Sequence, residues 1–585
     1  MFKFKQIGAL SAALVLTLAA GCSRQAAAPA VPAVAPDNPA WTSFVNAYVE
    51  STFKAQPMFA VQSGRHEFDG RMPDFSAAGI AAEGRRLQEQ RAAALAFDAR
   101  ALSADQAFER DYLVSELDDE YFWLVKAEFP FRNPAWYVNQ LDPEVYLSRE
   151  YAPLEQRLPG YLGYARSIPG IAAAVRTNLR TPMPKSFVEY AIKGFGGFAE
   201  FYGSDVPKVF ASIKDEAKQK ELASVNAAAV KAMLDLKNWF IAQRKTANEA
   251  YALGPQLYAA MLHDTDSVDM PVAAIKAAGE ADAARNTAAL KEVCAAYAPG
   301  KSIPECAAKM RAHKPTGGSV QAAREQLDEL REFVRSHDLV SIPSEVQAQV
   351  AEAPPYNRGN SAYIIVPGFY EKNVASVYSI SPPDPAWTAK ERHDYLEGVG
   401  KLTSTSVHEV WPGHYLQFLH SNRSKSIMGR LVVGYDFAEG WAHYCEEMMW
   451  DAGLMNDQPE FHVAQLMDAL WRDARLLSSI GLHTEGMTVE QSEKLFRELS
   501  YNDPGNARQQ AARGTYDPAY LNYTLGKLQI RKLRDDWIAR QMAGKPGARA
   551  RDYWKPFHDA FLSYGGPPIP LVRHAMLPGD AGPLL

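Results

Sequence analysis

Apolar residues recur at helical spacing over most of this chain. Between residues 41 and 338 they return every three or four positions, as in the segments 187–195 and 230–240. This period predicts amphipathic helices that bury one face. Proline and glycine interrupt the pattern at 153, 159–160 and 182–184, where helices are expected to end. The helical period returns from residue 392 onward, so the fold class is predicted to be mainly α.

Two short segments depart from the helical pattern. Residues 363–366 and 376–380 are rich in β-branched and aromatic side chains, which is typical of strands. Pro367, Gly368 and a polar link separate them, which predicts a small β-hairpin beside the active-site helices. Its edge strand could pair with an extended peptide, or it could pack against the rest of the protein.

The N-terminus resembles an export signal. Lys3 and Lys5 precede an apolar run over 7–21 that is too short to span a bilayer, as in a secretory leader. Small residues stand directly before Cys22, similar to a bacterial lipobox. We therefore expect residues 1–21 to be removed and Cys22 to be acylated. An ordinary periplasmic protein with a cysteine at that place is the alternative.

The segment after the leader has the composition of a tether. Residues 22–40 are rich in Ala and Pro and predict an extended linker. Ser23 favours, by resemblance, the periplasmic face of the outer membrane. The rest is expected to form one integrated unit, with a helical part over 41–345 and a metal-binding part over 346–585.

Composition excludes several classes of protein. The chain has 585 residues, of which 47% are hydrophobic and 22% charged, so a disordered chain is excluded. The formal net charge of −6 argues against a nucleic-acid partner. The sequence has no phosphate-binding loop, no G-x-S-x-G elbow and no C-x-x-C pair. It does not indicate an oligomeric state.

The remaining cysteines predict structural roles. Cys294 and Cys306 are twelve residues apart in a polar stretch. In an oxidising compartment a local disulfide is expected there; a metal site has less support, because no other cysteine or histidine has suitable spacing. Cys445 lies in an aromatic helix and is expected to be buried.

A metal motif occupies residues 408–414. His408 is followed by Glu409 and, six residues after the first histidine, by His414. Zinc hydrolases commonly carry two histidines four apart on one helix face. Six residues would place them about 120° apart on an ideal helix. Pro412 and Gly413 lie between them and predict a break that could bring both imidazoles to one ion. Alternatively, His414 caps a helix.

A third ligand is expected from a downstream helix. Glu439, His443 and Glu446 follow at i, i+4 and i+7, which places them on one helix face. Such a face is often solvated, but its neighbours here are aromatic residues and methionines, and buried acids require partners. We predict that Glu439 is a metal ligand and that Glu446 orients an imidazole. We predict no role for His443. Two histidines and a glutamate favour zinc without fixing the metal.

The two motifs resemble a known family. His-Glu-x-x-Pro-Gly-His at 408–414 and Glu-Gly-Trp-Ala-x-Tyr-x-Glu at 439–446 are similar to the bacterial family called domain of unknown function 885. The segments 516–527 and 557–562 also fit it, and the resemblance extends from about residue 41 to the C-terminus.

The resemblance implies a zinc-peptidase-like protein. The family looks similar to mostly helical metallopeptidases with a long substrate channel, such as the thimet-oligopeptidase and angiotensin-converting-enzyme groups. By that resemblance His408, His414 and Glu439 bind Zn²⁺, and Glu409 is the general base. The family's own substrates are poorly defined.

Further residues are expected near the reaction. Asp517 and Pro518 predict a helix start, after which Tyr520, Tyr523 and Lys527 share a face. Tyr523 is the candidate oxyanion donor, although these tyrosines could simply pack. Arg513, Lys527 or Arg534 could bind a substrate carboxylate, or each could be a surface charge.

Three functions remain open at this stage. The leading hypothesis is a lipid-anchored periplasmic enzyme that hydrolyses short peptides, with zinc-bound water activated by Glu409. The second is an amidase or endopeptidase acting on murein peptides. The third is a non-catalytic lipoprotein that binds peptide or metal.

Overall fold

The computed structural model describes residues 36–354, 358, 361–385, 387–501 and 503–585. Cys22, the expected leader and most of the tether therefore lie outside the described residues. The described part is mainly α-helical, as the hydrophobic period predicted. None of its helices is long and apolar enough to cross a membrane.

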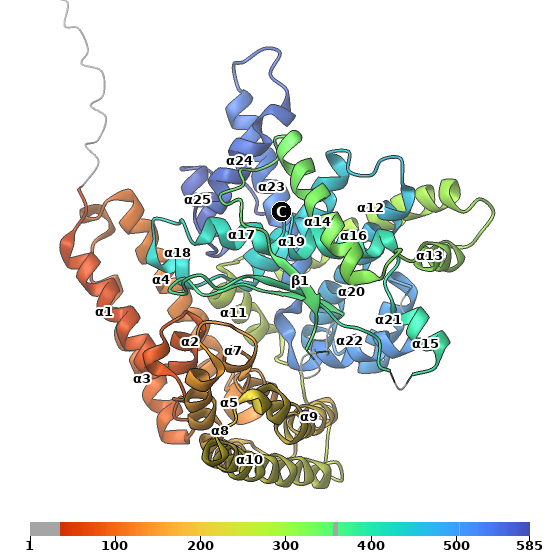
Figure 1. Ribbon diagram of the computed structural model, residues 1–585. Coiled ribbons are helices and arrows are strands. Elements are labelled where there is room, and N and C mark those ends of the chain that lie inside the picture. The colour runs from red at the N-terminus through yellow and green to blue at the C-terminus, as the bar shows by residue number, and fades with distance from the viewer. Residues whose placement is uncertain (1–35, 355–357, 359–360, 386, 502) are drawn as a thin grey trace, which may run out of the picture.

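Helices α1 to α10 occupy the left and lower side of Figure 1, coloured red to olive. The first eleven helices are α1 (Pro39–Ala55), α2 (Pro57–Gln62), α3 (Ala77–Leu95), α4 (Ala104–Tyr121), α5 (Phe129–Arg132), α6 (Ala135–Val138), α7 (Glu144–Leu147), α8 (Leu154–Asn178), α9 (Lys185–Val209), α10 (Glu216–Gln243) and α11 (Pro255–Asp266).

The remaining helices lie mostly on the opposite side, with the small sheet between the two groups (Figure 1). They are α12 (Val272–Tyr297), α13 (Ile303–Ala312), α14 (Ser319–Ser336), α15 (Ala389–Tyr395), α16 (Val399–Glu409), α17 (His414–Ser421), α18 (Ile427–Leu431), α19 (Tyr435–Asp451), α20 (Pro459–Thr484), α21 (Val489–Leu499), α22 (Pro504–Tyr516), α23 (Asn522–Met542), α24 (Trp554–Leu562) and α25 (Ile569–Met576).

Two expected boundaries differ from the structure. The tether was predicted to reach residue 40, but α1 begins at Pro39, because the side chain of Asn38 caps it by accepting a hydrogen bond from the Ala40 amide. Pro159 was predicted to end a helix, but α8 continues through it. Gly160 packs closely against the ring of Tyr146 at this point, so tertiary packing holds the helix together.

The sheet contains the predicted hairpin and one further strand. β2 (Ala362–Ile365) pairs antiparallel with β3 (Val377–Ile380), and Ile364 lies opposite Tyr378. The hairpin prediction is therefore confirmed. β1 (Gln349–Glu352) pairs in parallel with the other side of β3, which leaves β2 at an edge of the sheet. β1 was not predicted, since a strand of four residues with polar ends shows little alternation.

The two predicted parts of the chain share a core. One buried cluster combines Phe122 and Leu262 from the first part with Ile480 and Leu525 from the second. Burial of apolar side chains is the main contribution to the stability of a fold. Separation of the two parts would expose this shared apolar surface to water.

The described cysteines form one disulfide and leave one free thiol. Cys294 of α12 and Cys306 of α13 form a disulfide, the pairing expected from the sequence, and tie these consecutive helices together. Cys445 is a free cysteine and is fully buried in α19.

Candidate metal centre

The two histidines of the motif stand on consecutive helices. α16 ends at Glu409 and α17 begins at His414, so the break falls at the predicted place. Gly413 is required in the connection, because a side chain there would collide with the backbone carbonyl of His408. The change of direction brings the imidazole rings of His408 and His414 to a centroid separation of 4.8 Å, nearly perpendicular to each other.

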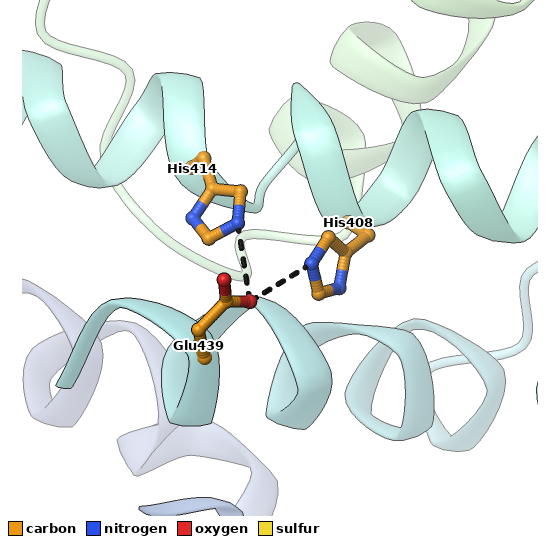
Figure 2. Close-up of side chains that lie close together, drawn as sticks. All are labelled: His408, His414 and Glu439. Atoms are coloured by element: carbon orange, nitrogen blue, oxygen red, sulfur yellow. Dashed lines mark ion pairs between the residues drawn. The ribbon is translucent and has the colours of Figure 1, made fainter. Parts of the chain in front are cut away.

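Glu439 completes the group from α19. Its Oε2 lies 3.3 Å from Nε2 of His408 and 3.5 Å from Nε2 of His414, as Figure 2 shows. One ligand atom from each residue lies within 4.8 Å of the others, the separation expected around a shared ion. The helix face predicted from the sequence therefore points at both imidazoles.

The donor set fits a cation. Glu439 Oε2 is buried and receives no hydrogen bond from any described residue. His408 Nδ1 lies 2.7 Å from the Glu446 carboxylate, which favours a proton on Nδ1 and directs the lone pair of Nε2 at Glu439. Two acceptors that face each other need positive charge between them. Two histidines and one glutamate also match a catalytic zinc site that keeps a position open.

Charge in the pocket supports the same conclusion. Burial disfavours the protonated form of His408, but Glu439 and Glu446 outweigh it and raise the pKa of His408 to about 9. A proton on Nε2, which a bound cation would replace, is thus one source of the positive charge that Glu439 attracts. Burial also opposes ionisation of Glu439, yet the charge of His414 and the contacts with His408 hold its pKa well below the ordinary range. The carboxylates therefore stay ionised and attract positive charge to this point.

Glu446 supports His408 from behind. It is fully buried, and its two carboxylate oxygens accept hydrogen bonds from His408 and, at 3.1 Å, from Arg472. The charge of Arg472 offsets the burial and holds the pKa of Glu446 well below normal. A third nitrogen, Nδ1 of His443, lies farther from the Glu446 carboxylate, at 3.4 Å. Burial lowers the pKa of His443 to about 4, so that histidine is neutral.

Glu409 and Tyr523 stand beside the three ligands. Burial raises the pKa of Glu409, although His414, His408 and a backbone hydrogen bond from Ile364 oppose the shift. The hydroxyl of Tyr523 donates a hydrogen bond to Glu439 Oε1 over 2.9 Å. Burial and the charge of Glu439 raise the pKa of Tyr523, so its hydroxyl keeps its proton. Tyr523 therefore contacts Glu439, and Glu409 lies close enough to His408 and His414 for their charges to act on it.

A large cavity opens onto this centre. Its volume is about 2420 Å³, and its wall combines residues from both parts of the chain. Trp136 and Tyr190 come from the first part, and Glu409, Tyr435 and Trp471 come from the second. Ser361 and residues 362–364 of the edge strand β2 also line it. The space is ample for a segment of peptide.

The structure does not bring every predicted residue near the start of α23 to the site. Tyr520 is fully buried and donates to Ser478, and Lys527 is fully buried in an ion pair with Asp282. Neither residue lines the cavity, because both side chains point into the packing between helices. Asp517 does not cap the helix; it accepts a hydrogen bond from Arg513 instead.

Arg513 remains at the site. It lines the cavity, pairs with Asp517 at 2.8 Å and donates to the Tyr435 hydroxyl at 3.0 Å. Arg534 lies elsewhere and donates to the hydroxyl of Tyr444.

Sequence reasoning missed the cations on α20. Arg472 and Arg475 line the cavity at positions three apart on that helix. The available signal was a pair of arginines three apart in a helix rich in Leu and Ala, where charged residues are seldom buried without a partner.

Comparison with known proteins places the chain in a family. A sequence profile described as "Bacterial protein of unknown function (DUF885)" matches residues 57–576. The chain therefore belongs to the DUF885 family, as its motifs predicted. None of the curated proteins searched matches it.

Two solved structures share the fold. One is a candidate lipoprotein of unknown function from Shewanella oneidensis, with 24% identity and a TM-score of 0.75 over 92% of this chain and 99% of that chain. The other, a candidate lipoprotein from Colwellia psychrerythraea, has 17% identity and a TM-score of 0.75 over 92% of this chain and 98% of that chain.

Proposed function

From its family and from the geometry of its centre, we propose that this protein is a zinc-dependent hydrolase of peptide bonds in short peptides. One observation carries the proposal. Two imidazole nitrogens lie 3.3 and 3.5 Å from a buried carboxylate oxygen of Glu439 that receives no well-formed hydrogen bond from the described residues. They do so on the wall of a large cavity with Glu409 beside them. The ligand set and the adjacent glutamate are those that hydrolytic zinc chemistry uses.

His408, His414 and Glu439 would hold the ion. When bound, zinc polarises a carbonyl group and lowers the pKa of water. Glu446 accepts a hydrogen bond from Nδ1–H of His408 and would thereby keep Nε2 directed at the ion. Arg472 fixes Glu446 in turn through its ion pair at 3.0 Å.

Glu409 moves the proton. Its carboxylate takes a proton from the attacking water and passes it to the nitrogen of the departing amine. Burial raises its pKa toward the range in which it can perform both steps. Tyr523 keeps its proton and directs its hydroxyl at the centre, so it can donate a hydrogen bond to the oxyanion that develops from the substrate carbonyl.

The edge strand β2 would align the substrate. Residues 361–364 face the cavity, and β3 occupies only one side of β2. An extended peptide can pair with such an edge through backbone hydrogen bonds. Ile364 would hold this peptide near Glu409, since its backbone already contacts that carboxylate.

The proposed location is the bacterial cell envelope, with the chain anchored by an acyl group on Cys22. The leader-like N-terminus favours this location, and the two structures that share the fold are described as candidate lipoproteins. A periplasmic anchor would expose the enzyme to short peptides, including those released from murein.

Profiling of a peptide library by mass spectrometry tests the proposal. The wild-type protein should cleave linear peptides, a chelator should abolish cleavage and added zinc should restore it. Glu409→Gln should bind zinc as the wild type does, while its rate falls by at least about a thousandfold, because the proton acceptor is lost. Cleavage by Glu409→Gln at the wild-type rate would refute the role of this residue. Purified muropeptides, run beside unmodified linear peptides, separate a murein-directed enzyme from a general peptidase.

A further inference from the structure

Arg475 is a cation in the cavity wall with no counterion. Its Nε donates to Gln510 Oε1 over 2.9 Å, and among the described residues no carboxylate forms an ion pair with its guanidinium. Arg472 and Arg513, its cationic neighbours in the same wall, are each paired, with Glu446 and Asp517 respectively. Arg475 therefore differs from both neighbours because its charge forms no ion pair with a described residue.

The surroundings of Arg475 favour an incoming anion. Burial and the charge of Arg513 lower its pKa, which shows that its positive charge is poorly compensated. Besides the hydrogen bond to Gln510, aromatic faces stabilise the charge, because Cζ of Arg475 lies 4.6 Å from the centroid of the Tyr523 ring and 5.7 Å from that of Trp471. The two Nη nitrogens have no partner among the described residues, so they can form the bidentate pair that arginine makes with carboxylates.

The position of Arg475 relates it to the metal centre. It packs on the ring of Tyr523, whose hydroxyl donates to the ligand Glu439 over 2.9 Å. Contacts of a single side chain, Tyr523, thus span the gap between the guanidinium and Glu439. An extended peptide covers such a span with a few residues, at roughly 3.4 Å per residue.

We propose that Arg475 is a specificity-determining residue that binds a carboxylate of the peptide substrate close to the bond that is cleaved. This inference rests on the proposed function. The carboxylate is either the C-terminus of the substrate, which would make the enzyme act near chain ends, or an acidic side chain. In both cases the guanidinium of Arg475 forms paired hydrogen bonds to the two oxygens.

Equilibrium binding tests the inference without requiring catalysis. Calorimetric Kd values are measured in the Glu409→Gln background for Ala-Ala-Ala and its C-terminal amide, and for the amides of Ala-Asp-Ala and Ala-Asn-Ala. The acid member of one pair should bind about tenfold more tightly than its neutral partner. The pair that shows the difference identifies the source of the carboxylate.

Substitution of Arg475 then assigns the effect. Arg475→Gln should remove the preference, and Arg475→Lys should restore part of it. Arg551→Gln is the matched control, because Arg551 also stacks on an aromatic ring, 4.5 Å from the centroid of Trp554, but does not line the cavity. That control should keep the full preference.

The failures of the two proposals are distinguishable. Equal Kd values within both pairs, no measurable binding, or a preference that persists in Arg475→Gln would overturn the role of Arg475. If a preference that depends on Arg475 is seen while the wild-type protein cleaves neither acid peptide, the hydrolase proposal fails and the carboxylate site stands. If cleavage occurs, the ratio of kcat/KM for acid and amide should fall toward one in Arg475→Gln.

Discussion

At the scale of single residues, the centre is a series of charges that each depend on the next. Arg472 holds Glu446, Glu446 holds His408, and His408 faces Glu439. Every link is buried or nearly so, so the removal of one charge leaves its partner uncompensated at low dielectric. The proposed ligands thus depend on residues that would not themselves contact a metal.

Glu446→Gln tests this dependence. The substitution keeps the shape of the side chain and an oxygen that can accept from His408 Nδ1, but it removes the charge that makes the imidazole a better ligand. We expect zinc affinity to fall by about 10- to 100-fold. Competition with a chelator of known affinity measures it. Asp451→Asn, at the exposed end of the same helix, should leave zinc affinity unchanged.

Wild-type zinc affinity in Glu446→Gln would show that His408 is oriented by other contacts. Loss of affinity in both variants would instead indicate damage to α19 as a whole.

At the scale of helices and strands, the site is made where α19 crosses α23. Gly440 and Gly526 meet at the crossing: a Cβ on Gly440 would lie 2.6 Å from the Cα of Gly526. The close approach lets Tyr523 of α23 reach Glu439 of α19. The glycine inside the Glu-Gly-Trp-Ala motif is therefore required by packing and not by chemistry.

Gly440→Ala should destabilise the protein by about 1–3 kcal/mol, because the added methyl group meets backbone atoms that cannot move aside cheaply. It should also weaken hydrolysis, since Tyr523 and Glu439 would separate. Gly197→Ala in α9 is the matched control: nothing lies within 4 Å of its added Cβ, so the helix should gain stability. Thermal unfolding midpoints report both changes, and equal midpoints for the two variants would contradict the packing argument.

Much of the arrangement of helices and strands around the site could be predicted from the sequence. The helical period, the hairpin and the break at Pro412 and Gly413 follow from local rules, and so does the helix face that carries Glu439 and Glu446. The burial of Lys527 could not be predicted, because its partner Asp282 lies far away in the sequence on α12. For the same reason the sequence could not show that Arg475 has no carboxylate partner among the described residues. That property depends on distant segments that meet in the cavity wall.

At the scale of the whole molecule, acidic side chains from three helices lie close enough together for their charges to interact. Asp266 of α11 is 2% exposed, and the charges of Asp119 on α4 and Asp436 on α19 interact with it. Its oxygens accept hydrogen bonds from Asn522 at 2.9 Å and Thr265 at 2.8 Å. Burial outweighs these two hydrogen bonds and raises the pKa of Asp266 to about 7. The fold therefore carries a carboxyl group that prefers to stay protonated.

This preference sets the sign of a pH effect on stability. An aspartate in the unfolded chain titrates near pH 3.9, whereas Asp266 in the folded protein titrates at about 7. Between these values the folded state binds more protons than the unfolded state, so this residue's contribution to the free energy of unfolding falls as pH rises. Asp266→Asn removes the titration and retains an oxygen for Asn522.

Asp266→Asn should accordingly gain stability relative to the wild type by about 1–3 kcal/mol more at pH 8 than at pH 5. Thermal unfolding of both proteins at the two pH values measures the difference, and Asp235→Asn, which alters an exposed carboxylate of α10, should follow the wild type at both. A gain that is the same at pH 5 and pH 8 would mean that Asp266 is already ionised in the folded protein. Nearby positive charge would then have to stabilise the ionised acids of α4, α11 and α19. The stability of this region would in that case not depend on pH between 5 and 8.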